Sequence, residues 1–169
     1  MSEITFKRKF YDEMLEWKMN SNGKSALMID GARRVGKSTI AEVFAKNEYD
    51  DYLLIDFVNA SKDIKDNFDN LGNMDVFFRN LFLFAGKGLK SSNSVIIFDE
   101  VQKFPRAREA IKYLVKDGRY HYIETGSLIS IKKKSQEIVI PSEEDKRKMY
   151  PMDFEEFLWA KGINESVIA

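Results

Sequence analysis

The chain has 169 residues, enough for one domain with a substantial core and too few for two independent ones. Its 27 Lys and Arg residues balance 27 Asp and Glu residues, so no overall field draws it to nucleic acid or to an anionic membrane. The absence of Cys excludes disulfides, thiolate metal sites and cysteine nucleophiles. The N-terminus is charged, and the sequence has no long apolar run. We therefore expect a soluble, cytoplasmic protein with no membrane contact.

The first predicted element is an amphipathic helix over residues 4–19. Its apolar positions recur at steps of three and four, and they are Phe6, Phe10, Met14 and Trp17. The turn-like residues 20–23 would end this helix. We expect residues 1–24 to form a helix and linker that pack on a core domain of residues 25–169.

Strands and helices alternate along the rest of the chain. Short apolar runs predict strands over residues 26–29, 52–57, 95–98, 121–124 and 138–140. Helical spacing predicts helices after residue 38, over residues 76–85, and from Pro105 to a close at Asp117-Gly118. This alternation is typical of an α/β fold with a parallel sheet that is covered on both faces and binds ligands beyond the carboxyl ends of its strands. The charge-dense segments 132–134 and 143–148 are interpreted as solvated loops.

A phosphate-binding loop is the strongest chemical signal in the sequence. The segment Gly31-Ala32-Arg33-Arg34-Val35-Gly36-Lys37-Ser38 fits G-x-x-x-x-G-K-[ST] and lies between a predicted strand and a predicted helix. In such a loop the backbone N–H groups and the positive end of the helix dipole bind phosphate oxygens. Lys37 would bridge the β- and γ-phosphates, and the Ser38 hydroxyl would bind Mg²⁺. A Gly-containing turn that fits the pattern by chance is the structural alternative.

Two carboxylates follow the predicted strand at residues 95–98. Asp99 would hold Mg²⁺, and Glu100 would act as the general base on the attacking water. Strands often end in acidic turns, so this signal gains weight only from the phosphate loop upstream.

Hydroxyl groups follow the predicted strand at residues 121–124. Thr125, or as second choice Ser127, would lie near the γ-phosphate if this strand lies between the other two motif-bearing strands. The alternative is a turn whose hydroxyls bond only to backbone. Arg33 and Arg34 could contact phosphate or face solvent, and the single His, His121, is interpreted as a strand residue.

These motifs resemble the prokaryotic AAA-superfamily ATPases with a Gly-x-Arg-x-x-Gly-Lys-[Ser/Thr] phosphate loop. The likeness lies in Gly31 to Thr39, in Ile97-Phe98-Asp99-Glu100-Val101-Gln102-Lys103, in Thr125-Gly126-Ser127 and in residues 150–158. It implies a P-loop NTPase three-layer sandwich with a five-stranded parallel sheet in the order 5-1-4-3-2. It also implies that Thr125 is a sensor of the γ-phosphate and that residues 31–39 bind the nucleotide.

The resemblance further implies a lid and a C-terminal domain after the ATPase core, and neither is recognisable before Ala169. An arginine finger from a neighbouring subunit is unassigned, although Arg147 lies where relatives often carry an Arg. We therefore expect ATP and Mg²⁺ as cofactors, with a homo-oligomer or another protein as a partner.

Three functions remain open at this point. The first is an ATPase whose hydrolysis drives a conformational change in an attached domain or partner, and the second is a nucleotide-gated module with little hydrolysis. The third is a small-molecule kinase, although no Arg-rich lid pattern is visible. Without an Asn-Lys-x-Asp segment a GTPase is disfavoured. Nucleic acid could meet the basic residues 132–134, but nothing else in the sequence indicates it.

Overall fold

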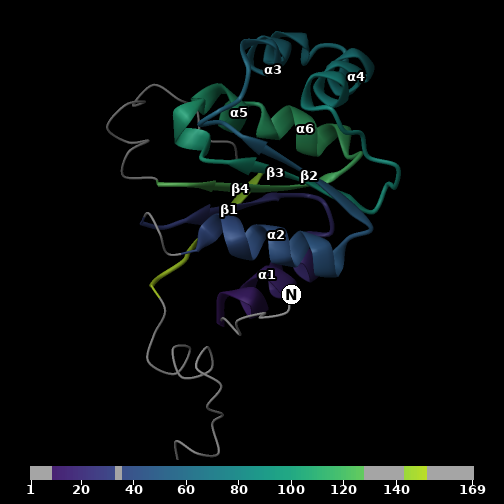
Figure 1. Ribbon diagram of the computed structural model, residues 1–169. Coiled ribbons are helices and arrows are strands. Elements are labelled where there is room, and N and C mark those ends of the chain that lie inside the picture. Colours follow the sequence, from purple (N-terminus) through teal and green to yellow (C-terminus); the bar gives the residue numbers. More distant parts are fainter. Residues whose placement is uncertain (1–8, 33–35, 128–142, 152–169) are drawn as a thin grey trace, which may run out of the picture.

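The computed structural model describes residues 9–32, 36–127 and 143–151. They form three layers, with a parallel sheet between α1 and α2 on one face and α3 to α6 on the other (Figure 1). The strands are β1 (Ala26–Asp30), β2 (Asp51–Asp56), β3 (Ser94–Asp99), β4 (His121–Gly126) and β5 (Glu144–Lys148). The helices are α1 (Lys9–Ser21), α2 (Lys37–Glu48), α3 (Lys62–Asp66), α4 (Met74–Ala85), α5 (Pro105–Glu109) and α6 (Ile111–Asp117), with the 3₁₀ turns η1 (Asn67–Asn70) and η2 (Val101–Lys103).

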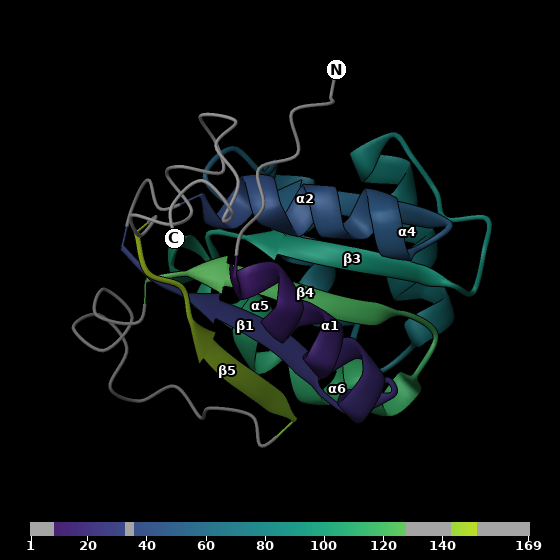
Figure 2. The ribbon, with the colours of Figure 1, turned by 90° about the horizontal axis from the view of Figure 1, so that it is seen from below.

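The sheet has the order β2-β3-β4-β1-β5, and every pairing in it is parallel. Reversed, this is the predicted order 5-1-4-3-2, so both the predicted fold and the strand order are confirmed. The strand β4 lies between β1 and β3, as Figure 2 shows. The carboxyl ends of the two motif-bearing strands therefore flank the end of β4.

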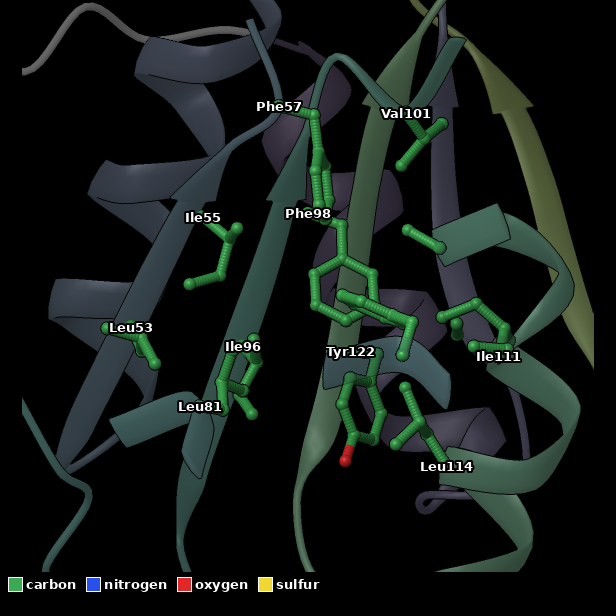
Figure 3. Packing of buried hydrophobic residues seen from close by; sticks show 14 of the residues in the cluster. Leu53, Ile55, Phe57, Leu81, Ile96, Phe98, Val101, Ile111, Leu114 and Tyr122 are labelled. Carbon is green, nitrogen blue, oxygen red and sulfur yellow. The ribbon is translucent and has the colours of Figure 1, made fainter. Parts of the chain in front are cut away.

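The central strands are apolar because helices cover both of their faces. Every residue of β3 is buried, and the sequence Ser-Val-Ile-Ile-Phe-Asp shows no alternation of polar and apolar positions. Under α3 to α6 the core is rich in aromatic rings, and Phe57 and Phe98 lie edge to face at 5.5 Å (Figure 3). On the opposite face, Trp17 of α1 and Phe44 of α2 are fully buried against the sheet.

The prediction that residues 143–148 form a solvated loop is wrong, because these residues form β5. Its backbone pairs with the outer edge of β1, and flanking bonds run from Ala26 N to Glu143 O at 2.8 Å and from Met149 N to Asp30 O at 2.7 Å. The strand lies at the sheet edge and carries only charged side chains, a composition that discourages pairing with further strands. The strand predicted over residues 138–140 lies outside the described residues.

Two predicted helices differ in detail from the observed ones. The helix expected from Pro105 to Asp117 is divided at Ala110 into α5 and α6, and Gly118 closes α6 at φ 78° as expected. The helix α4 begins at Met74, two residues before the predicted start at residue 76; its side chains Phe77, Phe78 and Leu81 are buried, whereas Leu83 is 71% exposed. The amphipathic helix predicted from residue 4 is described from Lys9 as α1.

Candidate functional site

The loop between β1 and α2 lies at the carboxyl edge of the sheet. Gly36 has φ 96°, a left-handed conformation that favours glycine, and it precedes the first residue of α2. No side chain caps this helix, and its first turn contains no acidic residue. The first backbone N–H groups and the positive end of the dipole are therefore not neutralised by a cap, as in an anion-binding helix start.

Lys37 turns back over the beginning of this loop. Its side chain is buried, and Nζ donates to Gly31 O at 2.7 Å and to Ala32 O at 2.9 Å. Carbonyl oxygens are neutral acceptors, so these bonds hold the ammonium in place without neutralising its charge. The loop thus places a buried cation beside the start of α2.

Asp99 is the point at which three elements meet. Its Oδ1 accepts from Ser38 Oγ of α2 at 2.6 Å and from Thr125 Oγ1 of β4 at 2.6 Å. Thr125 Oγ1 in turn accepts from Glu100 N at 3.0 Å. Two residues that the sequence placed in different motifs, Ser38 and Thr125, therefore lie within hydrogen-bonding distance of the carboxylate of a third motif. Hydroxyl and carboxylate oxygens are also the ligand atoms that Mg²⁺ prefers.

Glu100 has an unusual backbone conformation for a residue with a side chain. Its φ of 61° and ψ of 54° are left-handed, which costs about 1–2 kcal/mol relative to the right-handed region. The conformation ends β3 and begins η2. The side-chain Oε1 accepts from Gln102 Nε2 at 2.8 Å. Strain of this kind concentrates at functional sites.

The other predicted site residues are placed as follows. Gly31 N donates to Gly126 O at 3.3 Å, which joins the phosphate-loop strand to the end of β4. Thr39 is exposed on the first turn of α2, and Ser127 is partly buried just beyond β4. The predicted loop residues Arg33, Arg34 and Val35 lie outside the described residues.

Arg147 lies on β5 and is held within the chain. Its guanidinium donates to Glu16 Oε1 at 2.9 Å and to Glu13 O at 3.1 Å, and it also bonds to Asp145. These contacts tie β5 to α1. A finger role for Arg147 in a neighbouring subunit remains a prediction that no observation tests.

A buried charge cluster was not predicted from the sequence. Arg108 of α5 donates to both carboxylate oxygens of Glu144 on β5, at 2.9 and 2.6 Å, and both side chains are only 1% exposed. Glu124 of β4 completes this cluster and is fully buried. The signal available in the sequence was an acidic residue directly after the apolar pair Tyr122-Ile123 in a predicted strand, since a buried Glu is uncommon without a partner.

Burial raises the pKa of Glu124 well above its ordinary value, and the neighbouring charge of Glu144 raises it further, whereas Arg108 opposes the shift. Neither carboxylate oxygen of Glu124 has a hydrogen-bond donor within the described part of the chain. The surroundings of Glu124 therefore favour the neutral form of its carboxyl group.

Within residues 9–32, 36–127 and 143–151 no group of three His, Asp or Glu side chains could hold a metal by itself. The same residues include no helix long and apolar enough to cross a membrane.

Fold and site together define a P-loop nucleotide-binding domain. A protein-family profile described as an AAA domain matches residues 23–158. The chain therefore belongs to the AAA domain family, which places it among nucleotide-binding domains. A sequence comparison with curated proteins gave no match.

Proposed function

We propose that this domain binds ATP together with Mg²⁺ and hydrolyses it to ADP and phosphate. The observation that carries the proposal is the convergence of Ser38 and Thr125 on Asp99, beside the buried ammonium of Lys37. A hydroxyl, a carboxylate and a cation at the start of an uncapped helix are the groups that polyphosphate and its metal require.

Lys37 and the loop bind the phosphates in this proposal. The ammonium exchanges the carbonyls of Gly31 and Ala32 for β- and γ-phosphate oxygens, so that its acceptors carry negative charge instead of being neutral. The backbone N–H groups at the start of α2 bind the same oxygens. Residues 31–39 then form the nucleotide site, with Thr39 at its outer end.

Ser38 and Asp99 are the proposed metal ligands. Their side-chain oxygens are already 2.6 Å apart, so a small opening of this pair creates a site with two hard oxygen donors. When bound, Mg²⁺ neutralises the negative charge that accumulates on the phosphate oxygens.

Glu100 is the proposed general base. Its carboxylate takes a proton from water as the water oxygen bonds to the γ-phosphorus and the bond to the β-phosphate oxygen breaks. Thr125 is the proposed sensor, because its hydroxyl contacts both Asp99 and the backbone of Glu100. Through these two contacts a movement of the Asp99 carboxylate would shift the backbone of Glu100.

We propose further that hydrolysis drives a conformational change in an attached domain or a partner protein. Adenine is preferred over guanine, since the sequence has no Asn-Lys-x-Asp segment. We also propose that the protein is soluble and cytoplasmic. ATP and ADP would replace one another in its nucleotide site.

Phosphate release under single-turnover conditions tests the hydrolysis step. We expect Glu100→Gln to slow it by about 10²- to 10⁴-fold, because the amide cannot accept the proton. Nucleotide affinity should stay within about threefold of the original, a difference of less than 1 kcal/mol. Exposed Glu109→Gln on α5 is the matched control and should leave both quantities unchanged.

If Glu100→Gln hydrolyses ATP at the original rate, the assignment of the base is wrong. Tight ATP binding without phosphate release by the unaltered chain would instead favour the nucleotide-gated binding module.

A further inference from the structure

The turn that follows β3 directs one polar side chain inward. This turn is η2, in which Lys103 N donates to Glu100 O at 3.0 Å. Gln102 in its middle is only 8% exposed, an unusual burial for a Gln in a surface turn. The protein therefore encloses this side chain, and its contacts define where it lies.

The carbonyl end of the Gln102 amide lies against the end of β4. A Cβ atom at Gly126 would lie 2.7 Å from Gln102 Oε1 and 3.2 Å from Met28 Cε, so a larger residue there would displace the amide. Gln102 Oε1 is buried and has no hydrogen-bond donor within the described residues. A buried acceptor without a donor lowers stability, so the fold alone does not account for an amide at this place. Departures of this kind are expected at functional sites.

The other end of the amide holds the proposed general base. Glu100 Oε1 accepts from Gln102 Nε2 at 2.8 Å. An ionised carboxylate only accepts, so the NH₂ group must face it, and the bond is charge-assisted. The bond engages one carboxylate oxygen, Oε1, and leaves Oε2 able to accept a proton. The amide of Gln102 thus spans the space between the carboxylate of Glu100 and Gly126.

The backbone of Glu100 is held at the same strand end. Its N–H donates to Thr125 Oγ1 at 3.0 Å, and its conformation is left-handed at φ 61°. The next residue, Gly126, accepts at its carbonyl oxygen from Gly31 N, at the start of the phosphate loop. Thr125 therefore holds the backbone of Glu100, and Gln102 holds its carboxylate, both at the end of β4 and beside that loop.

A base acts only when its carboxylate lies close to the proton that it takes. The side chain of Glu100 has three rotatable bonds and is partly exposed, so without a partner its carboxylate would turn through many positions. A displacement of about 1 Å can lower a rate by about 10²-fold. A hydrogen bond from an enclosed neighbour removes much of this freedom.

We propose that Gln102 is a positioning residue for the general base, and that its amide NH₂ holds the Glu100 carboxylate beside the phosphate loop. Gln102 touches none of the reacting atoms and takes no proton. The attacking water gives its proton to Glu100 while its oxygen bonds to the γ-phosphorus, and ADP leaves with its β-phosphate oxygen. This inference rests on the proposed ATP hydrolysis and adds to it the group that orients the base.

Two rival roles for Gln102 give different results. If its hydrogen bond keeps Glu100 away from the water, removing the amide raises the rate of hydrolysis. If Gln102 only supports the turn, removing it lowers the melting temperature and acts on the rate whether or not residue 100 is a carboxylate. A positioning role predicts a slower rate, and only where that carboxylate is present.

Gln102→Met is the main variant, because Met has a similar length and volume but no hydrogen-bond donor. It also removes the buried carbonyl that lacks a donor, so the melting temperature should not fall. Gln102→Leu is the second variant and serves if Met does not fit the site. Lys103→Met, an exposed change in the same turn, is the matched control.

The first measurement is the single-turnover rate of phosphate release, together with the affinity for ATP and Mg²⁺. We expect Gln102→Met to lower the rate by at least about tenfold, because the carboxylate is no longer held. The affinity should change by less than about threefold, since the amide does not contact the nucleotide. Lys103→Met should match the unaltered chain in both quantities.

The second measurement repeats Gln102→Met in the Glu100→Gln background. No carboxylate remains there to be positioned, so the double variant and Glu100→Gln should differ by less than about twofold. A support of the turn would lower both backgrounds by the same factor. Affinity for ADP with Mg²⁺ and fluoroaluminate, a mimic of the transferring phosphoryl group, gives the same comparison without turnover.

Several results would overturn the inference. An unchanged or faster rate in Gln102→Met would do so, as would an equal loss in the presence and absence of the Glu100 carboxylate. In these cases the proposed function still stands if Glu100→Gln slows hydrolysis by the unaltered chain. If the unaltered chain binds no nucleotide, the proposed function fails, and the role of Gln102 fails with it.

Discussion

Two buried carboxylates lie on neighbouring strands and face opposite sides of the sheet. Asp99 ends β3 toward α2, is 9% exposed, and accepts hydrogen bonds from two hydroxyl groups. Glu124 lies in β4 opposite Phe98, toward α5, with no exposed surface and no donor to its carboxylate within the described residues. One acid faces the edge where ligands bind, and the other is enclosed beneath a helix.

The difference shows how one sheet can hold two buried acids that have different roles. Hydroxyl donors stabilise the charge of Asp99 at a place where a metal can reach it. Glu124 shares the low-dielectric interior with Glu144 beside Arg108, and burial together with the charge of Glu144 raises its pKa. We therefore expect Asp99 to govern activity and the Glu124 cluster to govern stability.

The largest expected effect is on the side of Asp99. Asp99→Asn replaces a charged metal ligand with a neutral amide, and we expect Mg²⁺-dependent hydrolysis to fall by roughly 10³-fold or more. Glu124→Gln, an equal change on the neighbouring strand, should leave hydrolysis within about threefold. Phosphate-release assays of the two variants measure both values. Equal losses of activity would remove the distinction between the two acids.

The next effect concerns the ion pair of the enclosed cluster. Arg108→Met fills similar space but leaves Glu144 buried without its cation, and we expect it to destabilise the fold by about 3 kcal/mol. Urea denaturation at neutral pH measures the change. Arg106→Met is the control on the same helix, since its partner Asp69 is exposed and such pairs contribute about 0–1 kcal/mol. If both variants unfold at the same urea concentration, the buried pair is not important for stability.

The smallest effect, at about 1.4 kcal/mol for each pH unit, is the pH dependence that Glu124 confers. Its pKa is raised in the folded state, so the folded chain keeps this proton while the unfolded chain releases it above a pH of about 4.3. The stability of the unaltered chain should therefore fall relative to Glu124→Gln by about 1.4 kcal/mol per pH unit above that value, until the folded pKa is reached. Thermal melts of both proteins between pH 5 and 8 measure this divergence. Parallel curves would contradict a raised pKa.

The parts of the fold that the sequence predicted are those with local signals. The loop at residues 31–38 has a strict spacing of glycines and Lys37, and the apolar run of β3 ends directly at Asp99. Parallel strands bring their carboxyl ends to one edge, so these residues had to lie close together once the strand order was right. The placement of Thr125 beside Asp99 follows from β4 lying between β1 and β3.

The rest depends on contacts that no local pattern contains. The edge strand β5 reads as a loop because all of its residues are charged, and only the free edge of β1 makes it a strand. Arg108 and Glu144 are 36 positions apart and pair only after α5 and β5 have packed on the sheet. The sequence also could not predict that Gln102 is buried against Gly126, because a turn residue after a strand is ordinarily exposed.

Calorimetry at millimolar Mg²⁺ measures directly whether the loop at residues 31–38 binds ATP. We expect binding heat for the unaltered chain and for Lys46→Ala, an exposed lysine of α2. The affinity of Lys37→Ala should be at least about 30-fold weaker, because this variant loses charge-assisted bonds to phosphate. No binding heat in the unaltered chain, or equal affinities for Lys37→Ala and Lys46→Ala, would show that this loop is not a nucleotide site.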